Sequence, residues 1–336
     1  MVHSRCYQLT APFYSGIGTI LMLHRVCPPT GRTRLVSNAV LEITPEYLEH
    51  MIAFFRERRY EIVSLDRLCE ILNNENKNER CIAFTFDDGY ADNYTYAYPI
   101  FKKHNIPFSV FVITSFPEKK AILWWYLLED LILENSCIRF ELDGDVYNLK
   151  CETPDKKEIT FLIMRRLIMD TEEGNQLFKV KKIFEEFSVD LHQKTDELAL
   201  SWEQIQQLSA DPLVTIGSHT VNHCMLRELP LVDMQREVVE ATQIIESHID
   251  KKVEHFSYPY GSVEAVGPRE FNFIRECGFK MAVTGRCANI FHEHREHLEC
   301  LPRFTINGEN SLSLLTLMMK GILPFLRNKG KRIVTD

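Results

Sequence analysis

CIAFTFDDGYADN, residues 81–93, is an apolar run that ends in two adjacent aspartates and a glycine. Residues 81–86 are rich in strand formers and predict a buried β-strand with Asp87 and Asp88 at its carboxyl end. In parallel α/β folds, catalytic groups lie at that end of the strands. Side chains alternate along an extended backbone, so the two carboxylates can take separate roles at one centre. Taken alone, however, Asp-Asp-Gly after a strand is more typical of a plain turn.

A second apolar run leads into a pair of histidines. In LVTIGSHTVNHCML, residues 213–226, His219 and His223 are four residues apart. On a helical turn, two imidazoles at this spacing share one face, as in metal-binding histidine pairs. A pair of surface histidines is the simpler interpretation of this segment alone. Together with Asp88, however, the pair makes a set of one carboxylate and two histidines, which suits a metal ion that keeps positions open for water and substrate.

A third segment of this kind is HFSYPYG, residues 255–261. Pro259 and Gly261 predict a turn after a short strand, which leaves the backbone N–H of Tyr260 free to point into a site. Such an N–H can stabilise an oxyanion. The three segments together therefore indicate metal-assisted hydrolysis.

TFDDG, SHTVNH and YPYG, in this order, resemble the first three motifs of the polysaccharide deacetylases, carbohydrate esterase family four. The resemblance extends from about residue 20 to about residue 306 and is interrupted by an insertion. It implies a distorted (β/α) barrel of seven or eight units that removes an N- or O-acyl group from a sugar. It also implies that Asp87 is the general base and that the metal ligands are Asp88, His219 and His223. Zn²⁺ is the default ion for such a set, and Fe²⁺, Co²⁺ or Ni²⁺ would also suit it.

The chain departs from the family pattern just before the Pro-Tyr turn. The family usually has an arginine there, which orients the catalytic base, whereas this chain has Ser257. Arg303, in LPRFTI, is a candidate substitute because a guanidinium can bind a carboxylate through two hydrogen bonds. If so, Arg303 contacts Asp87. A surface arginine beside a loop proline is an equally good interpretation.

A second departure concerns the last family motif, a strand that ends in histidine near the C-terminus. No such strand follows Cys300, but GTILMLHRV, residues 18–26, has this form. The chain is in this respect similar to circularly permuted members of the family, in which the final strand has moved to the front. This resemblance implies that His24 is the general acid, across the metal site from Asp87. A histidine that merely ends a core strand is the alternative.

Length and composition are consistent with such an enzyme. The 336 residues suffice for one barrel and an appendage, and a net charge of −8 argues against general nucleic-acid binding. The chain lacks an apolar run of about 18 residues, and its start lacks a clear signal-peptide pattern, which predicts a cytoplasmic protein. The ten cysteines are scattered without Cys-x-x-Cys spacing, as expected of reduced thiols.

The alternation of strand and helix patterns breaks in the middle of the chain. WWYLLEDLILE reads there as an amphipathic helix, and Asp143-Gly144 predicts a two-residue hairpin turn before two further helical stretches. Such an insertion can cover the site and select the substrate. We expect a deacetylase barrel at residues 1–115 and 201–310, an inserted α+β subdomain at 116–200, and a helical, basic tail at 311–336.

Two further segments allow more than one interpretation. FHEHREH, residues 291–297, has the composition of a metal tract, but we expect a solvated loop. The tail mixes an apolar stretch with basic residues, so it either makes weak contact with an anionic membrane surface or docks as a helix on the barrel.

These patterns predict a metal-dependent hydrolase that removes an N-acetyl, or another N- or O-acyl, group from a sugar, a glycan precursor or a lipid-linked sugar. Water activated by the metal would attack, with Asp87 as base and His24 as acid. One alternative is an amidohydrolase or deformylase that acts on a non-polysaccharide amide. Another is a non-catalytic carbohydrate-binding protein, which the intact set of ligands and base disfavours.

Overall fold

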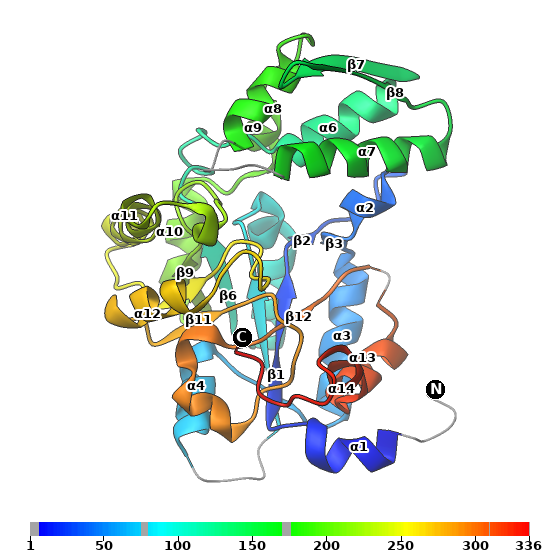
Figure 1. Ribbon diagram of the computed structural model, residues 1–336. Coiled ribbons are helices and arrows are strands. Elements are labelled where there is room, and N and C mark those ends of the chain that lie inside the picture. The colour runs from blue at the N-terminus through cyan, green and yellow to red at the C-terminus, as the bar shows by residue number, and fades with distance from the viewer. Residues whose placement is uncertain (1–6, 75–79, 170–175, 309, 336) are drawn as a thin grey trace.

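The centre of the protein is a curled, parallel β-sheet surrounded by helices (Figure 1). The structure, a computed structural model, describes residues 7–74, 80–169, 176–308 and 310–335. Within these residues the sheet has eight strands, and β4 (Glu61–Ile62) pairs with the start of β5. The spatial order of the others is β11 (Met281–Val283), β10 (His255–Ser257), β9 (Val214–Ser218), β6 (Phe108–Val112), β5 (Cys81–Phe86), β1 (Gly18–Leu23) and β12 (Phe304–Thr305).

The two ends of the sheet are joined through the segment that leads into β12. Phe304 of β12 pairs with Leu21 of β1, and Leu301, slightly earlier in the chain, bridges to Val283 of β11. The N–H of Thr284 donates to the carbonyl of Leu301 at 2.8 Å. The sheet therefore curls toward closure, and it has the form of the predicted distorted (β/α) barrel. The first strand of the chain lies between the strand that carries the two aspartates and the last strand.

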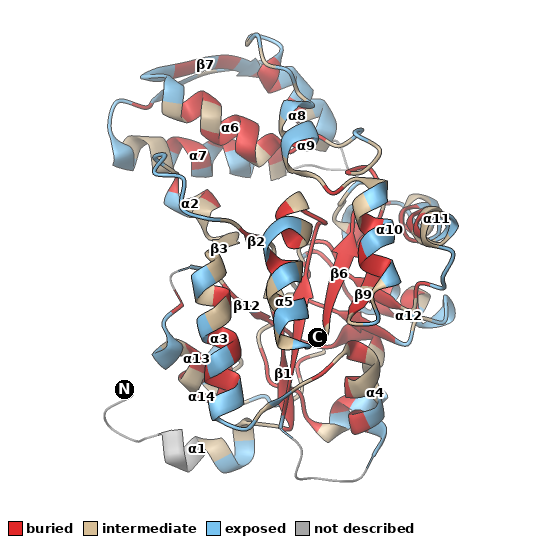
Figure 2. Cartoon of the chain, turned by 180° about the vertical axis from the view of Figure 1, so that it is seen from behind, coloured by how far each residue is buried: buried red, intermediate tan, exposed pale blue. Residues whose placement is uncertain are grey.

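Helices cover the outside of this sheet, and Figure 2 shows the strands buried with exposed helix faces around them. α3 (Pro45–Glu57) begins as predicted, because the side chain of Thr44 accepts a hydrogen bond from the N–H of Tyr47. A capping box between Ser201 and Gln204 likewise starts α10 (Trp202–Ala210). The other barrel helices are α4 (Leu65–Asn73), α5 (Tyr98–His104, after a π-helical turn at Asn93–Ala97), α11 (Leu231–Ile249) and α12 (Pro268–Glu276).

Aromatic side chains pack behind β5 and hold it in place. Phe84 contacts Phe101 edge to face at 5.2 Å, and Phe86 contacts Phe108 in the same way at 5.8 Å between ring centroids. Phe101 and Phe108 stack on each other at 4.4 Å. Such pairs contribute beyond the area that they bury. They fix the strand whose carboxyl end carries the two aspartates.

The insertion lies above the carboxyl ends of the strands (Figure 1). Asp143 and Gly144 have φ angles of 55° and 87°, as the predicted two-residue turn requires. Trp124, Phe140 and Phe161 belong to an apolar cluster apart from the main barrel core. Residues 170–175 lie outside the described residues, and the division into subdomains stays a prediction. The elements here are α6 (Trp124–Glu134), β7 (Cys137–Leu142), β8 (Asp145–Lys150), α7 (Pro154–Met169), α8 (Gln176–Phe184) and α9 (Gln193–Leu198).

A buried carboxylate anchors the insertion to the barrel. Glu129 of α6, which is 2% exposed, accepts hydrogen bonds from both Nε and Nη2 of Arg34, at 2.7 and 2.9 Å. It also accepts from the N–H of Leu35 at 2.7 Å and from the Asn38 amide at 2.6 Å. The three residues that donate these hydrogen bonds lie in α2 (Val36–Ala39) and just before it, between β2 (Arg25–Val26) and β3 (Glu42–Ile43). One acid side chain thus connects the insertion to a segment that follows β1.

The C-terminal tail docks on the barrel beside α1 (Tyr7–Tyr14) as two helices, α13 (Leu312–Met319) and α14 (Ile322–Arg327). Leu315, Met318 and Met319 join the main apolar core, and the rings of Tyr14 and Phe325 are 4.9 Å apart. The tail therefore has the docked form, and membrane contact stays an untested prediction. No helix of the described residues is both long and apolar enough to cross a membrane.

The histidine-rich run is not the solvated loop that its composition predicts. It forms a short 3-10 turn, His292–Glu296, which a second one, Leu298–Cys300, follows, and His294 is fully buried. The Nδ1 atom of His294 accepts a hydrogen bond from the N–H of Phe291 at 3.0 Å. This local cap turns the imidazole inward, and burial lowers the pKa of His294 to about 4.

The Glu129→Gln substitution tests the anchor of the insertion. It should lower the free energy of unfolding by about 3 kcal/mol, because an amide NH2 group then faces donors that are buried with it. The adjacent Asp130, which pairs with Arg32 and Lys194 near the surface, supplies the matched control. Asp130→Asn should cost less than about 1 kcal/mol in the same urea titration. Equal losses for the two variants would remove the anchoring role.

Candidate active site

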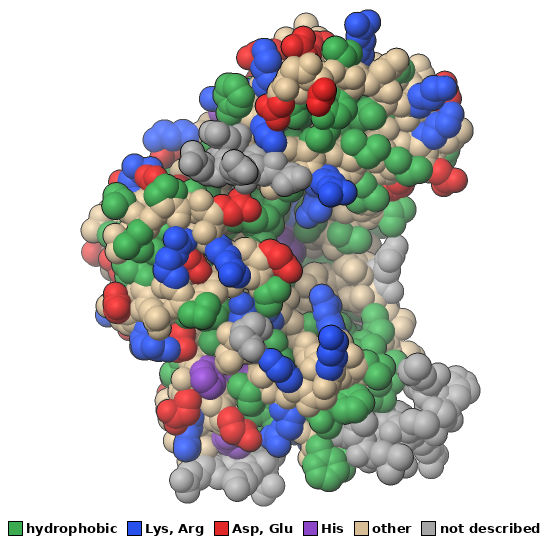
Figure 3. Space-filling view, viewed as in Figure 1, with side chains coloured by type: hydrophobic (Ala, Val, Ile, Leu, Met, Phe, Trp, Pro, Cys, Tyr) green, Lys and Arg blue, Asp and Glu red, His purple; other side chains and the backbone are tan. Residues whose placement is uncertain are grey.

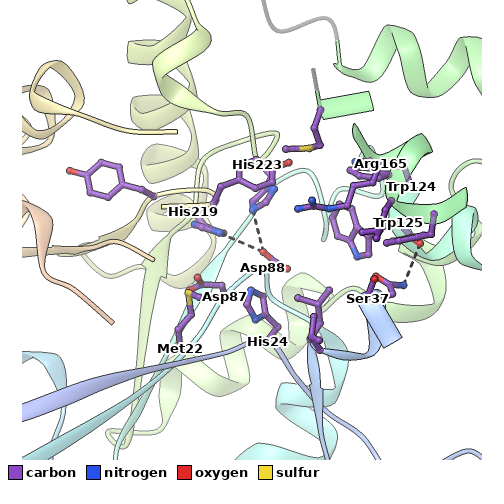
Figure 4. A pocket seen from close by; sticks show the side chains of 18 residues that line it. Met22, His24, Ser37, Asp87, Asp88, Trp124, Trp125, Arg165, His219 and His223 are labelled. Carbon is purple, nitrogen blue, oxygen red and sulfur yellow. Dashed lines mark hydrogen bonds and ion pairs between the residues drawn. The ribbon is translucent and has the colours of Figure 1, made fainter. Parts of the chain in front are cut away.

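The carboxyl ends of the strands meet around one cavity of about 350 Å³, which the insertion covers from above (Figure 4). Asp87 and Asp88 follow β5, and His24 follows β1. His219 follows β9, and Tyr260 lies in the turn after β10. All but one of the predicted site residues line this cavity, and the exception is Arg303. The lining residues among them are His24, Asp87, Asp88, His219, His223 and Tyr260.

One carboxylate and two imidazoles converge at the centre of the cavity. Candidate ligand atoms of Asp88, His219 and His223 all lie within 4.8 Å of one another. The Nε2 atoms of the two histidines are 3.5 and 3.6 Å from Oδ1 of Asp88. The Nδ1 atom of His219 is 2.7 Å from the carbonyl oxygen of Ser257, which fixes the ring with Nε2 toward Asp88. Such an oxygen and nitrogen donor set fits a divalent metal with open coordination positions.

The two histidines come together on a loop, not on the helical turn that their spacing predicts. Residues 219–225 are not helical, and Thr220 and His223 have positive φ angles of 67° and 58°. The Oγ1 atom of Thr220 accepts a hydrogen bond from the N–H of His223 at 3.0 Å and stabilises this bend. Asp88 also has a positive φ, 74°. Non-glycine residues rarely adopt this conformation, and it is concentrated at functional sites.

The protonation states of this cluster favour metal binding. Burial outweighs the attraction of Asp88 and lowers the pKa of His223 to about 4, so its imidazole is neutral near pH 7. Burial by itself raises the pKa of Asp88, but hydrogen bonding to His219, together with attraction to His223 when that ring is protonated at low pH, holds it well below its usual value. A neutral His223 and an ionised Asp88 are the forms that bind a metal.

Arg303 binds Asp87 through two parallel contacts. Nη1 donates to Oδ1 and Nη2 donates to Oδ2, each at 2.7 Å. Both side chains are buried, with 1% and 2% exposure for Arg303 and Asp87. Burial alone would raise the pKa of Asp87, but the charge and hydrogen bonds of Arg303, together with the nearby histidines, outweigh it, so the pKa lies below its usual value. The surface alternative for Arg303 is therefore wrong.

Further hydrogen bonds hold the Arg303 guanidinium in place. Nε donates to the carbonyl of Thr284 at 3.0 Å, and Nη1 donates to the hydroxyl of Thr85 at 3.1 Å. Nη2 also donates to the hydroxyl of Ser257 at 2.9 Å, and Ser257 in turn donates to Oδ2 of Asp87 at 3.3 Å. Ser257, which occupies the position of the family arginine, is thus a hydrogen-bond partner of Arg303, which comes from the β12 segment.

His24 and Asp87 follow neighbouring strands and line the same cavity. The β1–β5 register pairs Leu23 with Phe86, so the residues that follow them end adjacent strands. The placement of His24 across the metal site from Asp87 stays a prediction. The Nδ1 atom of His24 is buried and has no hydrogen-bond partner among the described residues.

Tyr260 lines the cavity from the turn after β10. Its N–H makes no hydrogen bond to any residue in the described part of the chain, and its φ is positive, at 60°. Its ring lies 4.7 Å from that of His223, and its hydroxyl accepts a hydrogen bond from Gln176 of α8 at 3.3 Å. The turn thus leaves the N–H without a protein partner, as the Pro-Tyr-Gly pattern predicts.

The upper wall of the cavity comes from α2 and the insertion, and most of it was not identified from the sequence. Trp124 is 5% exposed and belongs to the apolar cluster of the insertion, whereas the ring of Trp125 lies 6.3 Å from that of His223. Arg165 of α7 lines the same wall. A single basic residue on a polar-faced helix gives no sequence signal of such a position. The remaining wall residues are Ser37, Asn38, Val40, Leu41, Phe161, Leu162 and Met169.

Comparison with known proteins agrees with this geometry. The family model of the polysaccharide deacetylases matches residues 74–282, which include the three motifs but neither His24 nor Arg303. YxkH of Bacillus subtilis (strain 168), which is named provisionally for this family, is 30% identical over 95 residues. The alignment spans 28% of this chain and 31% of YxkH, so less than a third of that relative is covered.

Two solved structures share the fold. The Streptococcus pyogenes deacetylase PplD in complex with acetate gives a TM-score of 0.57 at 16% identity, over 90% of this chain and 97% of that one. IcaB from Ammonifex degensii gives 0.56 at 17% identity, over 91% and 97%. The predicted barrel is therefore confirmed. Because the family model matches most of the barrel and all three strand-end motifs, we conclude that this chain belongs to the polysaccharide deacetylase family.

Proposed function

We propose that this protein is a metal-dependent deacetylase that removes an acetyl group, or a related acyl group, from an amino sugar. The observation that carries the proposal is a buried carboxylate, Asp87, held by Arg303 directly beside a second carboxylate, Asp88, that faces two histidines. Hydrolysis of an amide needs a base and an electrophile at one point. Asp87 would be the base, and Asp88 would help to hold the metal ion that supplies the electrophile.

Asp88, His219 and His223 would hold the metal ion. Zn²⁺ is the first choice for two imidazoles and a carboxylate, and Fe²⁺, Co²⁺ or Ni²⁺ accept the same donors. When bound, the ion would polarise the acyl oxygen and make the attacking water more acidic. The contact of His219 with the Ser257 carbonyl supports the ligand role, because it leaves only Nε2 available.

Asp87 would take the proton of the attacking water. Its two oxygens are held by Arg303, so the carboxylate is ionised and cannot turn to join the metal ligands. A base needs this combination of charge and fixed direction. The same contacts argue against a non-catalytic carbohydrate-binding protein, in which a buried arginine and carboxylate pair beside the metal ligands would serve no purpose.

Two further groups would act on the tetrahedral intermediate. The N–H of Tyr260 would donate a hydrogen bond to the oxyanion. His24 would then protonate the leaving nitrogen, because an amine leaves poorly as an anion and histidine titrates near neutral pH. The free Nδ1 of His24 in the cavity wall supports this role.

Metal content and turnover separate the roles of the two aspartates. Asp88→Ala and His219→Ala should lose the metal, whereas Asp87→Asn should retain it and lose about 10²–10⁴-fold in kcat. Elemental analysis of the purified variants and an acetate-release assay over N- and O-acetylated sugars provide the two readouts. Equal metal loss in all three variants would reverse the assignment. Absence of acetate release from every sugar by the metal-loaded wild type would contradict the function itself.

Arg303→Lys tests the orienting role. A lysine keeps the positive charge but not the two parallel contacts, so Asp87 loses its fixed direction. We expect metal content to stay unchanged and kcat to fall about 100-fold, with KM nearly constant. Thermal unfolding of the metal-loaded variant controls for loss of the fold. A folded variant with wild-type kcat would show that catalysis does not depend on Arg303 to orient Asp87.

His24→Ala tests the proposed acid. The variant should keep the metal and lose about 100-fold or more on amide substrates. Activated aryl esters should suffer much less, because their leaving groups need no proton. Comparison of the two substrates with one enzyme preparation removes errors in metal loading. If both substrates lose activity to the same extent, or neither does, His24 is not the acid.

A further inference from the structure

An unpaired guanidinium lies in the wall of the candidate active site. Arg165 of α7 lines the cavity together with Asp88, His223 and Trp125, and Figure 4 shows it on the insertion side of the pocket, facing the site. Among the described residues it makes no hydrogen bond and no ion pair. Arg303 below the site has an acid partner, and so does Arg34 beneath the insertion. Arg165 therefore differs from these arginines in having its donors free.

The charge balance of the cavity makes this position unusual. Asp87 and Asp88 are the only carboxylates among the described lining residues, and Arg165 is the only lysine or arginine. The charge of Asp87 is neutralised by Arg303, and a divalent ion would more than neutralise Asp88. With Arg165, the described lining of the metal-loaded cavity thus has a positive charge, although the chain as a whole has a net charge of −8. A positive cavity in a protein of negative net charge attracts anions, so anionic sugars bind there more readily than neutral ones.

Arg165 lies in the same cavity as the groups proposed to act on the substrate. It lines the wall together with Tyr260 and His223, whose rings are 4.7 Å apart. Figure 3 shows a histidine side chain in a hollow under the insertion, with basic side chains at the upper edge of that hollow. Leu162 and Met169 on the same helix give the wall an apolar surface on either side of the guanidinium. A sugar ring between the metal ligands and α7 would lie against this wall.

We infer that Arg165 selects acylated sugars that carry an oxyanion, a phosphate or a carboxylate, on the same sugar unit as the acyl group. A guanidinium presents paired N–H donors that match both groups. The inference rests on the proposed deacetylase function and specifies its substrate class. It makes Arg165 a specificity-determining residue that touches the substrate away from the scissile bond.

A substrate series with one variable group tests this inference. N-acetylglucosamine, its 1-phosphate, its 6-phosphate and the corresponding N-acetylated uronic acid differ only in the presence, position and kind of oxyanion. The wild-type, zinc-loaded protein should prefer at least one charged sugar over the neutral one by about tenfold or more in kcat/KM. Arg165→Gln should reduce that ratio to within about threefold of one, through KM. The charged sugar whose kcat/KM falls most in the variant identifies the preferred anion as phosphate or carboxylate.

The neighbouring Arg166 provides the matched control. It is exposed on the same helix and does not line the cavity, so Arg166→Gln should leave the wild-type preference in place. Raising the salt concentration should weaken the preference of the wild type, because an exposed charge is screened. A wild type without preference, or an Arg165→Gln variant that keeps it, would overturn the inference.

A binding arm keeps this test independent of turnover. Isothermal titration of the zinc-loaded protein with N-acetylglucosamine 1-phosphate and with the uronic acid should show about tenfold weaker binding for Arg165→Gln with one of them. Equal affinities of wild type and variant for both ligands would contradict the inference. If no sugar releases acetate but the variant still binds more weakly, the deacetylase function fails while the anion site stands.

Discussion

The ion pair between Asp87 and Arg303 is the contact on which the rest of the site depends. Removing two charges from water is expensive and is offset only when geometry and further hydrogen bonds are nearly complete. Here both carboxylate oxygens and all three guanidinium nitrogens have partners, supplied by Thr85, Ser257 and Thr284. These partners come from β5, from β10 and from the end of β11. The pair therefore forms only when the sheet has curled enough for the side chain of Arg303, just before β12, to reach Asp87 at the end of β5.

The same contact gives the two adjacent aspartates, Asp87 and Asp88, different partners. Asp87 contacts Arg303, whereas Asp88 faces the histidines from the turn after β5, where its backbone is left-handed. Left-handed backbone at Asp88, Thr220 and His223 then shapes the loops around the ligand set. The insertion completes the cavity from above, and Glu129 ties it to the segment that follows His24. The strand ends that carry the candidate catalytic residues and the insertion that faces the substrate are thus connected by direct contacts.

Much of this arrangement follows from local sequence, and the remainder depends on contacts between distant residues. The strand before Asp87, the hairpin at Asp143 and the cap at Ser201 are set by neighbouring residues, and each is present. The Arg303 contact was one of two equal interpretations, because no local pattern says which carboxylate a distant arginine meets. The Glu129 anchor joins residues 95 apart and was not predicted. The burial of His294 and the loop that carries His219 were misjudged, since composition and spacing do not reveal backbone direction.

The most direct measurement is a crystal structure of the zinc-loaded protein with anomalous scattering recorded at the zinc edge. We predict one strong peak within coordinating distance of Asp88, His219 and His223, with Asp87 still bound to Arg303 and outside the coordination sphere. A peak at the second His, Glu and Cys group, His297, Glu299 and Cys300, with none at Asp88 would contradict it. So would an Asp87 carboxylate that has left Arg303 to join the metal.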